Sequence, residues 1–431
     1  MVNPTQPLPA GGQGREAVAL REVGHTDVPP LALWVLLASF LGGIAAVPLV
    51  ESTEMGALVR SHLGAAIGPV DAAGLWQRVV SINRVVLARM NAFERALEDQ
   101  SILGRSLRPR TQALMIGWLG SGNERVYAGR DGWLFFRPDV EYIAGRGFLE
   151  RREIERRIAA AAEWTTSPHP DPRPAILRFN DDLAARGITL IVMPTPVKPG
   201  IQPEMLARRH AEAEGVLHNV SYREFVEDLE RGGVRVFDPS QALAAARLTA
   251  PQYLAADTHW RPEAMEMVAE RLAAIISATM ALPARPEPGH RIERSEVSNV
   301  GDIARMLDLP DGSPLFPPEV VWLRRVLQSD GRPWRSSRDA DVLLLGDSFS
   351  NIYALESMGW GTSAGFAEHL AYALRRPVDR IVQNDEGAFA TRAMLQREPA
   401  RLHGKRVVIY QFAERELAFG DWKVIELADR Q

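Results

Sequence analysis

Two short stretches of the 431-residue chain hold residue types that together could perform nucleophilic catalysis. The first reads Asp-Thr-His-Trp at 257–260, and the second reads Gly-Asp-Ser-Phe-Ser at 346–350, directly after an apolar run. A serine hydroxyl such as that of Ser348 is a poor nucleophile until a base removes its proton. His259 could supply that base, and Asp257 could orient its ring and stabilise the imidazolium that forms. These three residues predict a Ser-His-Asp triad.

The spacing of Asp257 and His259 has meaning only in a particular backbone conformation. Residues two apart point to the same side of an extended chain, whereas on a helix they diverge by about 200°. Because residues before a proline favour extended conformations, Pro262 leads us to expect both side chains on one side. The alternative is that Asp257 or Thr258 caps the helix after Pro262 while His259 stays on the surface. Asp347 could likewise do no more than cap the helix after its own turn.

Composition narrows the classes of function. Fifty basic and 54 acidic side chains give a formal charge of −4, which argues against a nucleic-acid partner. The absence of cysteine excludes disulfides, thiolate metal sites and a cysteine nucleophile. The histidines show no usual metal-ligand spacing, and neither GxGxxG nor GxxxxGK followed by Ser or Thr occurs. We therefore expect no metal and no cofactor.

An α/β framework must position the triad, because short apolar runs alternate with helical stretches through the C-terminal 300 residues. Apolar strands separated by helices predict a mainly parallel sheet that is covered on both faces. Ser348 follows one such run, so we expect it at the carboxyl edge of the sheet, where sites form in open parallel sheets. The strand-like runs are 130–136, 188–194, 234–238, 341–347, 379–385 and 405–412.

A stretch of twenty residues without a charge, 31–50, lies near the N-terminus. A helix of that length spans roughly 30 Å, the thickness of a bilayer core, so we predict a retained transmembrane anchor. A cleaved signal peptide and a buried helix are the alternatives. Two arginines precede the stretch and only Arg60 follows it closely, which favours a cytoplasmic N-terminus and an extracytoplasmic remainder. We expect a polar tail at 1–30 and a helical membrane-proximal segment at 51–120.

The two motifs resemble a rearranged branch of the SGNH hydrolase superfamily, the alginate O-acetyltransferase family that includes AlgJ and AlgX. Ordinary SGNH enzymes carry the serine motif early and Asp-x-x-His late, whereas this chain has Asp-x-His before its serine, as that branch does. The resemblance covers about residues 120–425. Four further stretches are similar to the family: DGWLFF at 131–136, MPTPVKPGIQPE at 193–204, GDIARML at 301–307 and IYQFAERELAF at 409–419.

The resemblance implies an SGNH-like α/β/α sandwich at 121–431 and a role for each triad residue. Ser348 resembles the acetyl-accepting nucleophile, His259 the general base and Asp257 its orienter. The family acetylates secreted polysaccharides outside the inner membrane and works with a membrane-bound O-acyltransferase that supplies acetyl groups. About eighty residues follow Ser348, too few for the carbohydrate-binding domain of the AlgX type, so an anchored AlgJ-like architecture with a periplasmic catalytic domain is expected.

The oxyanion hole and the reaction type stay open in the sequence. The Ser348 backbone N–H is one expected donor, and the Asn384 side chain, at the end of a predicted strand, is a candidate second donor. The alternative for Asn384 is an ordinary turn asparagine. Besides acetyl transfer, the same triad could serve a carbohydrate or lipid esterase. A non-catalytic scaffold of a polysaccharide export complex is the remaining alternative, and the intact triad argues against it.

Overall fold

The computed structural model describes residues 29–50, 56, 58–63, 74–160, 167–207, 215–384 and 387–427. The chain divides into two compact units, Met1–Leu107 and Arg108–Gln431. The two stretches that carry the predicted triad, 257–260 and 346–350, both lie in the second unit. The candidate site therefore lies within that unit, and the domain limits predicted at residues 30, 50 and 120 stay predictions.

Helices make up the described part of the first unit. They are α2 (Pro30–Val50), the short π-helix η1 (Val59–Leu63), α4 (Leu75–Gln100) and the first turns of α5 (Ile102–Leu119). The charge-free stretch at 31–50 thus forms a helix. Within the residues that the structure describes, no helix meets the requirements of length and apolarity for crossing a bilayer. The anchor stays a prediction.

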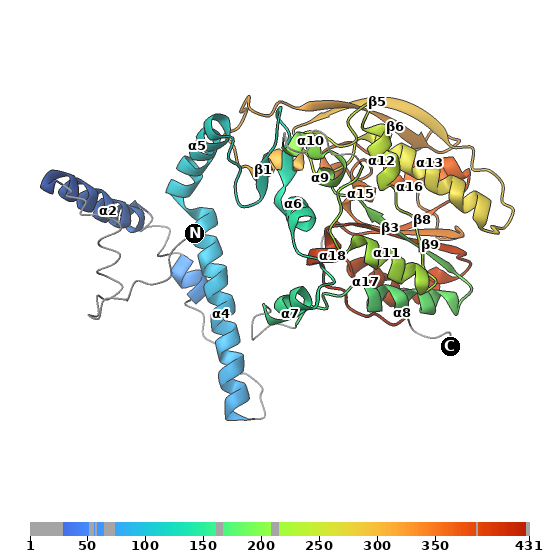
Figure 1. Ribbon diagram of the computed structural model, residues 1–431, viewed down its shortest axis with the longest axis horizontal. Coiled ribbons are helices and arrows are strands. Elements are labelled where there is room, and N and C mark those ends of the chain that lie inside the picture. Colours follow the sequence, from blue (N-terminus) through green and yellow to red (C-terminus); the bar gives the residue numbers. More distant parts are fainter. Residues whose placement is uncertain are drawn as a thin grey trace, which may run out of the picture. The chain divides into compact units, whose positions relative to one another are not determined.

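A five-stranded sheet forms the centre of the second unit (Figure 1). Its strands are arranged in the order β4 (Arg235–Val236), β3 (Thr189–Thr195), β9 (Val407–Ala413), β7 (Val342–Gly346) and β8 (Asp379–Val382). Every neighbouring pair in this sheet is parallel. The prediction of an α/β fold with a mainly parallel sheet is therefore confirmed.

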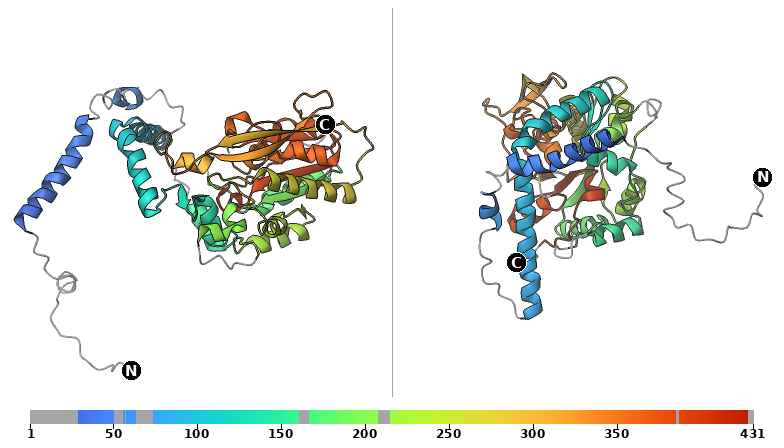
Figure 2. Two further views of the ribbon diagram at one scale, coloured as in Figure 1. Left: turned by 90° about the horizontal axis from the view of Figure 1, so that it is seen from above. Right: turned by 90° about the vertical axis from the view of Figure 1, so that its left-hand side faces the viewer.

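Alternate residues of the central strands enter two different hydrophobic cores. On β7, Leu344 belongs to a core shared with α13 (Pro262–Thr279) and α16 (Phe366–Leu374). Its neighbours Leu343 and Leu345 belong to a core shared with α8 (Arg173–Ala184), α11 (Tyr222–Arg231) and α17 (Ala390–Arg397). Figures 1 and 2 show these helix groups on opposite sides of the strands. Burial on both faces explains why the strands read as continuous apolar runs rather than alternating ones.

Two antiparallel hairpins lie outside the central sheet. The run at 130–136 forms β2 (Leu134–Phe136), which pairs with β1 (Val126–Ala128) instead of joining the parallel strands. The long hairpin of β5 (Arg291–Asn299) and β6 (Glu319–Leu327) had no counterpart in the sequence analysis. The other elements are α6 (Arg137–Ala144), α7 (Arg151–Ala159), α9 (Lys198–Ile201), α10 (Pro203–Leu206), α12 (Ser240–Ala246), α14 (Asp302–Met306), α15 (Ser348–Asn351), η3 (Glu356–Met358), η4 (Pro399–Leu402) and α18 (Glu416–Phe419).

Candidate active site

Ser348 is the first residue of α15 and lies two residues beyond the carboxyl end of β7. Asp347 is the N-cap of α15, and its Oδ1 accepts a hydrogen bond of 2.9 Å from the backbone N–H of Phe349. The capping role considered for Asp347 is therefore real. It does not compete with a chemical role for Ser348, because capping fixes the turn on which the serine is carried.

Gln411 on β9 ties this turn to the sheet. Its Oε1 accepts from the Asp347 backbone N–H at 3.0 Å and from the Ser350 hydroxyl at 2.7 Å, while its Nε2 donates to Asp347 Oδ1 at 2.8 Å. A Cβ at Gly346 would lie 2.5 Å from the Ser350 Oγ, so only glycine fits there. These buried contacts hold the backbone around the serine in one conformation.

The segment that carries Asp257 and His259 is not helical, but the expected extended conformation is wrong, because residues 257–259 form a bend. The two side chains meet across this bend. His259 Nδ1 lies 2.7 Å from Asp257 Oδ1, and the His259 backbone N–H donates to the same oxygen at 3.0 Å. The capping alternative is wrong, because α13 begins after Arg261 and has no side-chain cap. His259 is also not on the surface, since only 3% of it is exposed.

The structure brings all three predicted triad residues together. His259 Nε2 lies 2.9 Å from the Ser348 hydroxyl oxygen, although 89 residues separate the two along the chain. With Nδ1 donating to Asp257, Nε2 is the nitrogen free to accept the serine proton. This is the geometry of nucleophile, base and orienting carboxylate.

Asp257 is buried and fully hydrogen-bonded. Its Oδ2 accepts from the Trp360 indole N–H at 2.8 Å and from the Asp302 backbone N–H at 3.0 Å. Burial would raise the pKa of Asp257, but the hydrogen bonds and charge of His259 and the Trp360 hydrogen bond outweigh it, so the pKa is well below its usual value. Asp257 is therefore held as a carboxylate.

Asp302 brings a second carboxylate to the imidazole. Its Oδ2 lies 3.8 Å from His259 Nδ1, and its Oδ1 accepts from the Thr258 backbone N–H at 2.7 Å. Burial and the neighbouring charge of Asp257 raise the pKa of Asp302 to about 6. Burial opposes the charged form of His259, but Asp257 and then Asp302 outweigh it, so the pKa of His259 is raised.

These groups could also be considered as ligands for a metal ion, because one ligand atom from each of Asp257, His259 and Asp302 lies within 4.8 Å of the others. Most of these atoms already have hydrogen-bond partners. Both Asp257 oxygens and the Asp302 Oδ1 accept hydrogen bonds, and both imidazole nitrogens have partners. The contacts from Asp257 through His259 to Ser348 are those of a proton relay. The absence of a metal stays a prediction.

Lys198 holds the backbone around the site and was not among the residues predicted from the sequence. It is entirely buried, and its Nζ donates to the backbone carbonyls of Leu134 at 2.6 Å, Ala255 at 2.8 Å and Asp257 at 3.0 Å. Burial lowers the pKa of Lys198 to about 7, against the attraction of nearby carboxylates. Three carbonyl acceptors favour the ammonium form, which alone has three N–H donors. A lysine between prolines in an apolar stretch was the available signal.

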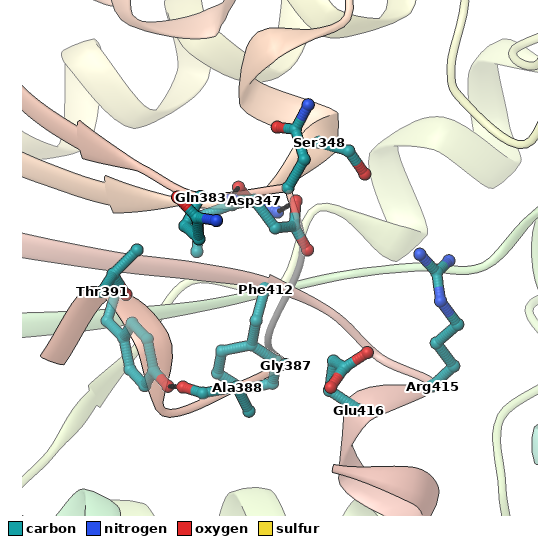
Figure 3. Close-up of a pocket in the computed structure, with 13 residues that line it drawn as sticks. Asp347, Ser348, Gln383, Gly387, Ala388, Thr391, Phe412, Arg415 and Glu416 are labelled. Atoms are coloured by element: carbon teal, nitrogen blue, oxygen red, sulfur yellow. Dashed lines mark hydrogen bonds between the residues drawn. The ribbon is translucent and has the colours of Figure 1, made fainter. Parts of the chain in front are cut away.

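A pocket of about 50 Å³ opens beside the serine at the carboxyl ends of β7, β8 and β9 (Figure 3). Asn384 lines this pocket together with Ser348. The Asn384 Oδ1 accepts from Asn351 Nδ2 at 2.9 Å, and its own Nδ2 lies 3.5 Å from the Met358 sulfur. Asn351 thus orients the Asn384 amide, while a role as oxyanion donor stays a prediction. Arg415 and Glu416 also line the pocket and were not among the predicted site residues.

Comparison with known families gives a match over most of the second unit. The family described as "SGNH hydrolase-like domain, acetyltransferase AlgX" matches residues 126–414. That range includes all the strands of the central sheet and all three residues of the Ser348–His259–Asp257 constellation.

Individual relatives agree with this match. The chain is 26% identical to the "Probable alginate O-acetylase AlgJ" of Pseudomonas aeruginosa over 302 residues, which cover 69% of this chain and 71% of that one. It is 24% identical to the protein of the same name in Pseudomonas putida over 300 residues, with the same two coverages. Among solved structures, the O-acetyltransferase domain of Pseudomonas putida AlgJ matches with a TM-score of 0.51 and 23% identity, covering 68% of this chain and 92% of that one. The structural match supports the fold.

Proposed function

The chain belongs to the family of SGNH hydrolase-like acetyltransferases that includes AlgX, and from that membership we propose that it transfers acetyl groups onto a secreted polysaccharide through an acetyl-serine. The observation that carries the proposal is the relay from Asp257 through His259 to Ser348, with contacts of 2.7 and 2.9 Å. The names of its relatives, alginate O-acetylases, support an alginate-like or other exopolysaccharide acceptor.

In the first half-reaction, the Ser348 oxygen attacks the acetyl carbonyl carbon while His259 Nε2 takes the hydroxyl proton. The imidazolium is stabilised by the ionised Asp257 at Nδ1. The tetrahedral intermediate places its negative charge on the former carbonyl oxygen, for which the Ser348 backbone N–H and the Asn384 amide are the proposed donors. As the intermediate collapses, the donor's leaving group departs with the proton from His259, and the acetyl group stays on Ser348.

In the second half-reaction, a sugar hydroxyl replaces the donor. His259, neutral again, accepts the hydroxyl proton while the sugar oxygen attacks the acetyl-serine carbonyl. Collapse breaks the bond to the Ser348 oxygen, which recovers its proton from His259. Water can make the same attack, so transfer depends on a bound acceptor that displaces water from the site. The same residues would give an acetylesterase where no acceptor is bound.

The cellular setting is part of the proposal. Residues 31–50 would anchor the protein in the inner membrane, with the catalytic domain in the periplasm and a membrane-bound O-acyltransferase as the acetyl supplier. The absence of charged residues from 31–50 and the slight excess of arginine before this stretch motivate the arrangement. A periplasmic active site would meet the polymer as it is exported.

The test uses the full chain in detergent, a chromogenic acetyl ester as donor and a polysaccharide fragment as acceptor. We expect release of the chromophore together with acetylated oligosaccharide, detected by mass spectrometry. Chromophore release with acetate as the sole product at saturating acceptor would identify an esterase instead. No release by the folded protein with any small acetyl ester would favour the scaffold and overturn the proposed chemistry.

A further inference from the structure

Arg415 is a positive charge in the active-site pocket that the triad mechanism does not use. It is the second residue after β9 and lines the same pocket as Ser348. In Figure 3 its guanidinium and the Ser348 hydroxyl are directed toward the same space. The Arg415 guanidinium lies 5.9 Å from the Phe349 ring, and the His259 ring lies 4.8 Å from that same ring. The arginine therefore flanks the reacting groups.

The guanidinium is held in place from its buried side. Nη1 donates to Asp139 Oδ1 at 3.1 Å, and the Asp139 side chain is fully buried. The ring of Phe136 lies 5.4 Å from the guanidinium carbon. Burial would lower the pKa of Arg415, but the carboxylates of Asp139, Glu416 and Asp347 raise it, so the side chain stays cationic. A fixed cation of this kind can bind a ligand without first being ordered.

The opposite side of the guanidinium has donors to spare. Among the residues that the structure describes, Nε and Nη2 of Arg415 have no hydrogen-bond partner. Neither atom is among the buried polar atoms that lack a partner, so both remain open to solvent. A guanidinium presents its donors as a rigid fork that matches two oxygens of a ligand.

Glu416 adds an acceptor next to these donors. Its carboxylate lines the pocket beside Arg415, on the same side in Figure 3. A donor fork beside a carboxylate is suited to neighbouring oxygens of a sugar, because a hydroxyl both accepts and donates a hydrogen bond. Asp139 and Glu416 offset part of the charge of Arg415, although burial raises the pKa of both carboxyls, so a free anion gains less here than beside an isolated guanidinium.

We propose that Arg415 and Glu416 form the acceptor subsite and bind one sugar unit of the polysaccharide by two neighbouring oxygens. Arg415 donates to one sugar oxygen and Glu416 accepts from an adjacent hydroxyl. A further hydroxyl of the same unit is thereby directed toward His259 and the acetyl-serine. This subsite rests on the proposed acetyl transfer, since it acts in the second half-reaction.

Binding of the acceptor can be measured separately from formation of the acetyl-serine, because acetyl-Ser348 reacts with either sugar or water. Acetylated sugar and free acetate arise from the same acetyl-Ser348, so their ratio does not depend on how fast the intermediate forms. Loss of an oxyanion donor slows both products together, whereas loss of acceptor binding lowers the ratio of sugar product to acetate. One charge-assisted hydrogen bond corresponds to about a tenfold change in such a ratio.

The experiment measures this ratio at subsaturating oligosaccharide for wild type, Arg415→Lys and Glu416→Gln. Arg415→Lys keeps a cation beside buried Asp139 but removes the fork, and Glu416→Gln keeps the shape of a half-buried side chain. Arg332→Gln is the matched control, because the exposed Arg332 pairs with Asp330 and does not line the pocket. We expect each subsite variant to lower the ratio about tenfold, with Arg332→Gln equal to wild type.

Three other results would contradict the acceptor subsite, and each can be told apart from the others. An unchanged ratio in both Arg415→Lys and Glu416→Gln, whatever their total turnover, overturns the acceptor subsite. A neutral and a uronic-acid oligosaccharide are compared in parallel: equal losses support recognition of hydroxyls, and a loss confined to the uronic acid overturns the hydroxyl pair in favour of carboxylate binding. If wild type makes no acetylated sugar from any acceptor, the proposed transferase function fails, and the subsite fails with it.

Discussion

The indole N–H of Trp360 donates a hydrogen bond of 2.8 Å to Oδ2 of Asp257, the oxygen turned away from the His259 ring. Trp360 is fully buried and lies 103 residues beyond Asp257 in the chain. The backbone N–H of Asp302 donates to the same oxygen at 3.0 Å. With donors fixed on both sides, the carboxylate cannot rotate, and Oδ1 stays directed at the imidazole.

The exchange Asp257→Asn tests the orienting carboxylate. Because two N–H groups donate to Oδ2, the Asn oxygen should take that position and its Nδ2 should face His259 Nδ1. There Nδ2 donates to Nδ1 and holds the proton of the imidazole on Nε2, the wrong tautomer, so ester turnover should fall by as much as about 10⁴-fold. From the sequence alone, this exchange is expected to leave stability unchanged, since Asn caps about as well as Asp. The structure predicts otherwise, because an Nδ2 at the Oδ1 position would leave the buried backbone N–H of His259 without its acceptor, at roughly 1–3 kcal/mol.

Kinetics and thermal unfolding of the same Asp257→Asn protein check both parts of this prediction. Trp360→Phe is the matched control, because it removes one donor and leaves the carboxylate and the histidine tautomer intact. It should lose stability with a much smaller loss of turnover. Equal turnover losses in the two variants would assign Asp257 a structural role only.

The exchange Ser348→Ala tests the nucleophile. It removes the one oxygen in contact with His259 Nε2 and leaves the strand, the Asp347 cap and the Gln411 contacts in place. Turnover of a small acetyl ester should fall by about 10⁴-fold or more, with little change in melting temperature. Intact-mass spectrometry should detect a trapped acetyl adduct in wild type but not in Ser348→Ala. Full activity of the folded variant would refute the acetyl-serine mechanism.

The exchange Asp302→Asn tests how the second carboxylate sets the pH dependence. His259 must be neutral to act as the base, so kcat/KM falls as the pH drops through its pKa. That pKa is raised by Asp257 and Asp302 against the effect of burial. Above a pH of about 6, Asp302 is ionised, and removing its charge should lower the pKa of His259. The acidic limb of the profile should therefore move to lower pH.

The Asn side chain can keep the Thr258 N–H bond at Oδ1, so a change of fold should not accompany the shift. The measurement is the pH profile of kcat/KM for a neutral acetyl ester in both proteins. A limb that stays in place, or moves to higher pH, would show that the Asp302 charge does not act on His259.

The exchange Asn384→Ala separates the oxyanion donor from the turn asparagine. Loss of one oxyanion donor typically costs about 10²–10³ in kcat. An asparagine that only shapes the turn should change kcat far less. Asn351→Ala is an informative companion, because Asn351 holds the Asn384 Oδ1 and so sets the direction of its amide. A near-wild-type kcat for Asn384→Ala would show that Asn384 is not a second oxyanion donor beside the Ser348 backbone N–H.

Fusion reporters test the proposed topology. A periplasm-dependent reporter placed after Gln431 should be active, and a cytoplasm-dependent reporter at the same position should be silent. Replacing the two upstream arginines at 15 and 21 should weaken the orientation, because basic residues favour the cytoplasmic side. A reporter after Gln431 that works only in the cytoplasm would contradict both the orientation and access to a secreted polymer.

The chemistry of the triad was predictable because its determinants are local. Asp257 and His259 meet through a local bend rather than the expected extended segment, because the Asp257 carboxylate accepts from the backbone N–H two residues on and so lies beside the imidazole. Ser348 follows a continuous apolar run, and the carboxyl end of such a strand is where a parallel sheet presents its site. The alternation of apolar strands and helices likewise predicted the parallel sheet, since each strand is buried on both faces.

Tertiary structure alone decided what surrounds the triad. Trp360, Asp302, Lys198 and Arg415 reach the site from segments far apart in the sequence, and no local pattern marks a tryptophan as a donor or a lysine as buried. The order of the strands and the β5–β6 hairpin also depend on pairing between distant segments. The amino-acid sequence determined which groups could react, because reactivity follows from residue type and local conformation. Their protonation, orientation and access to substrate depend on burial and long-range contacts, which exist only once the chain has folded.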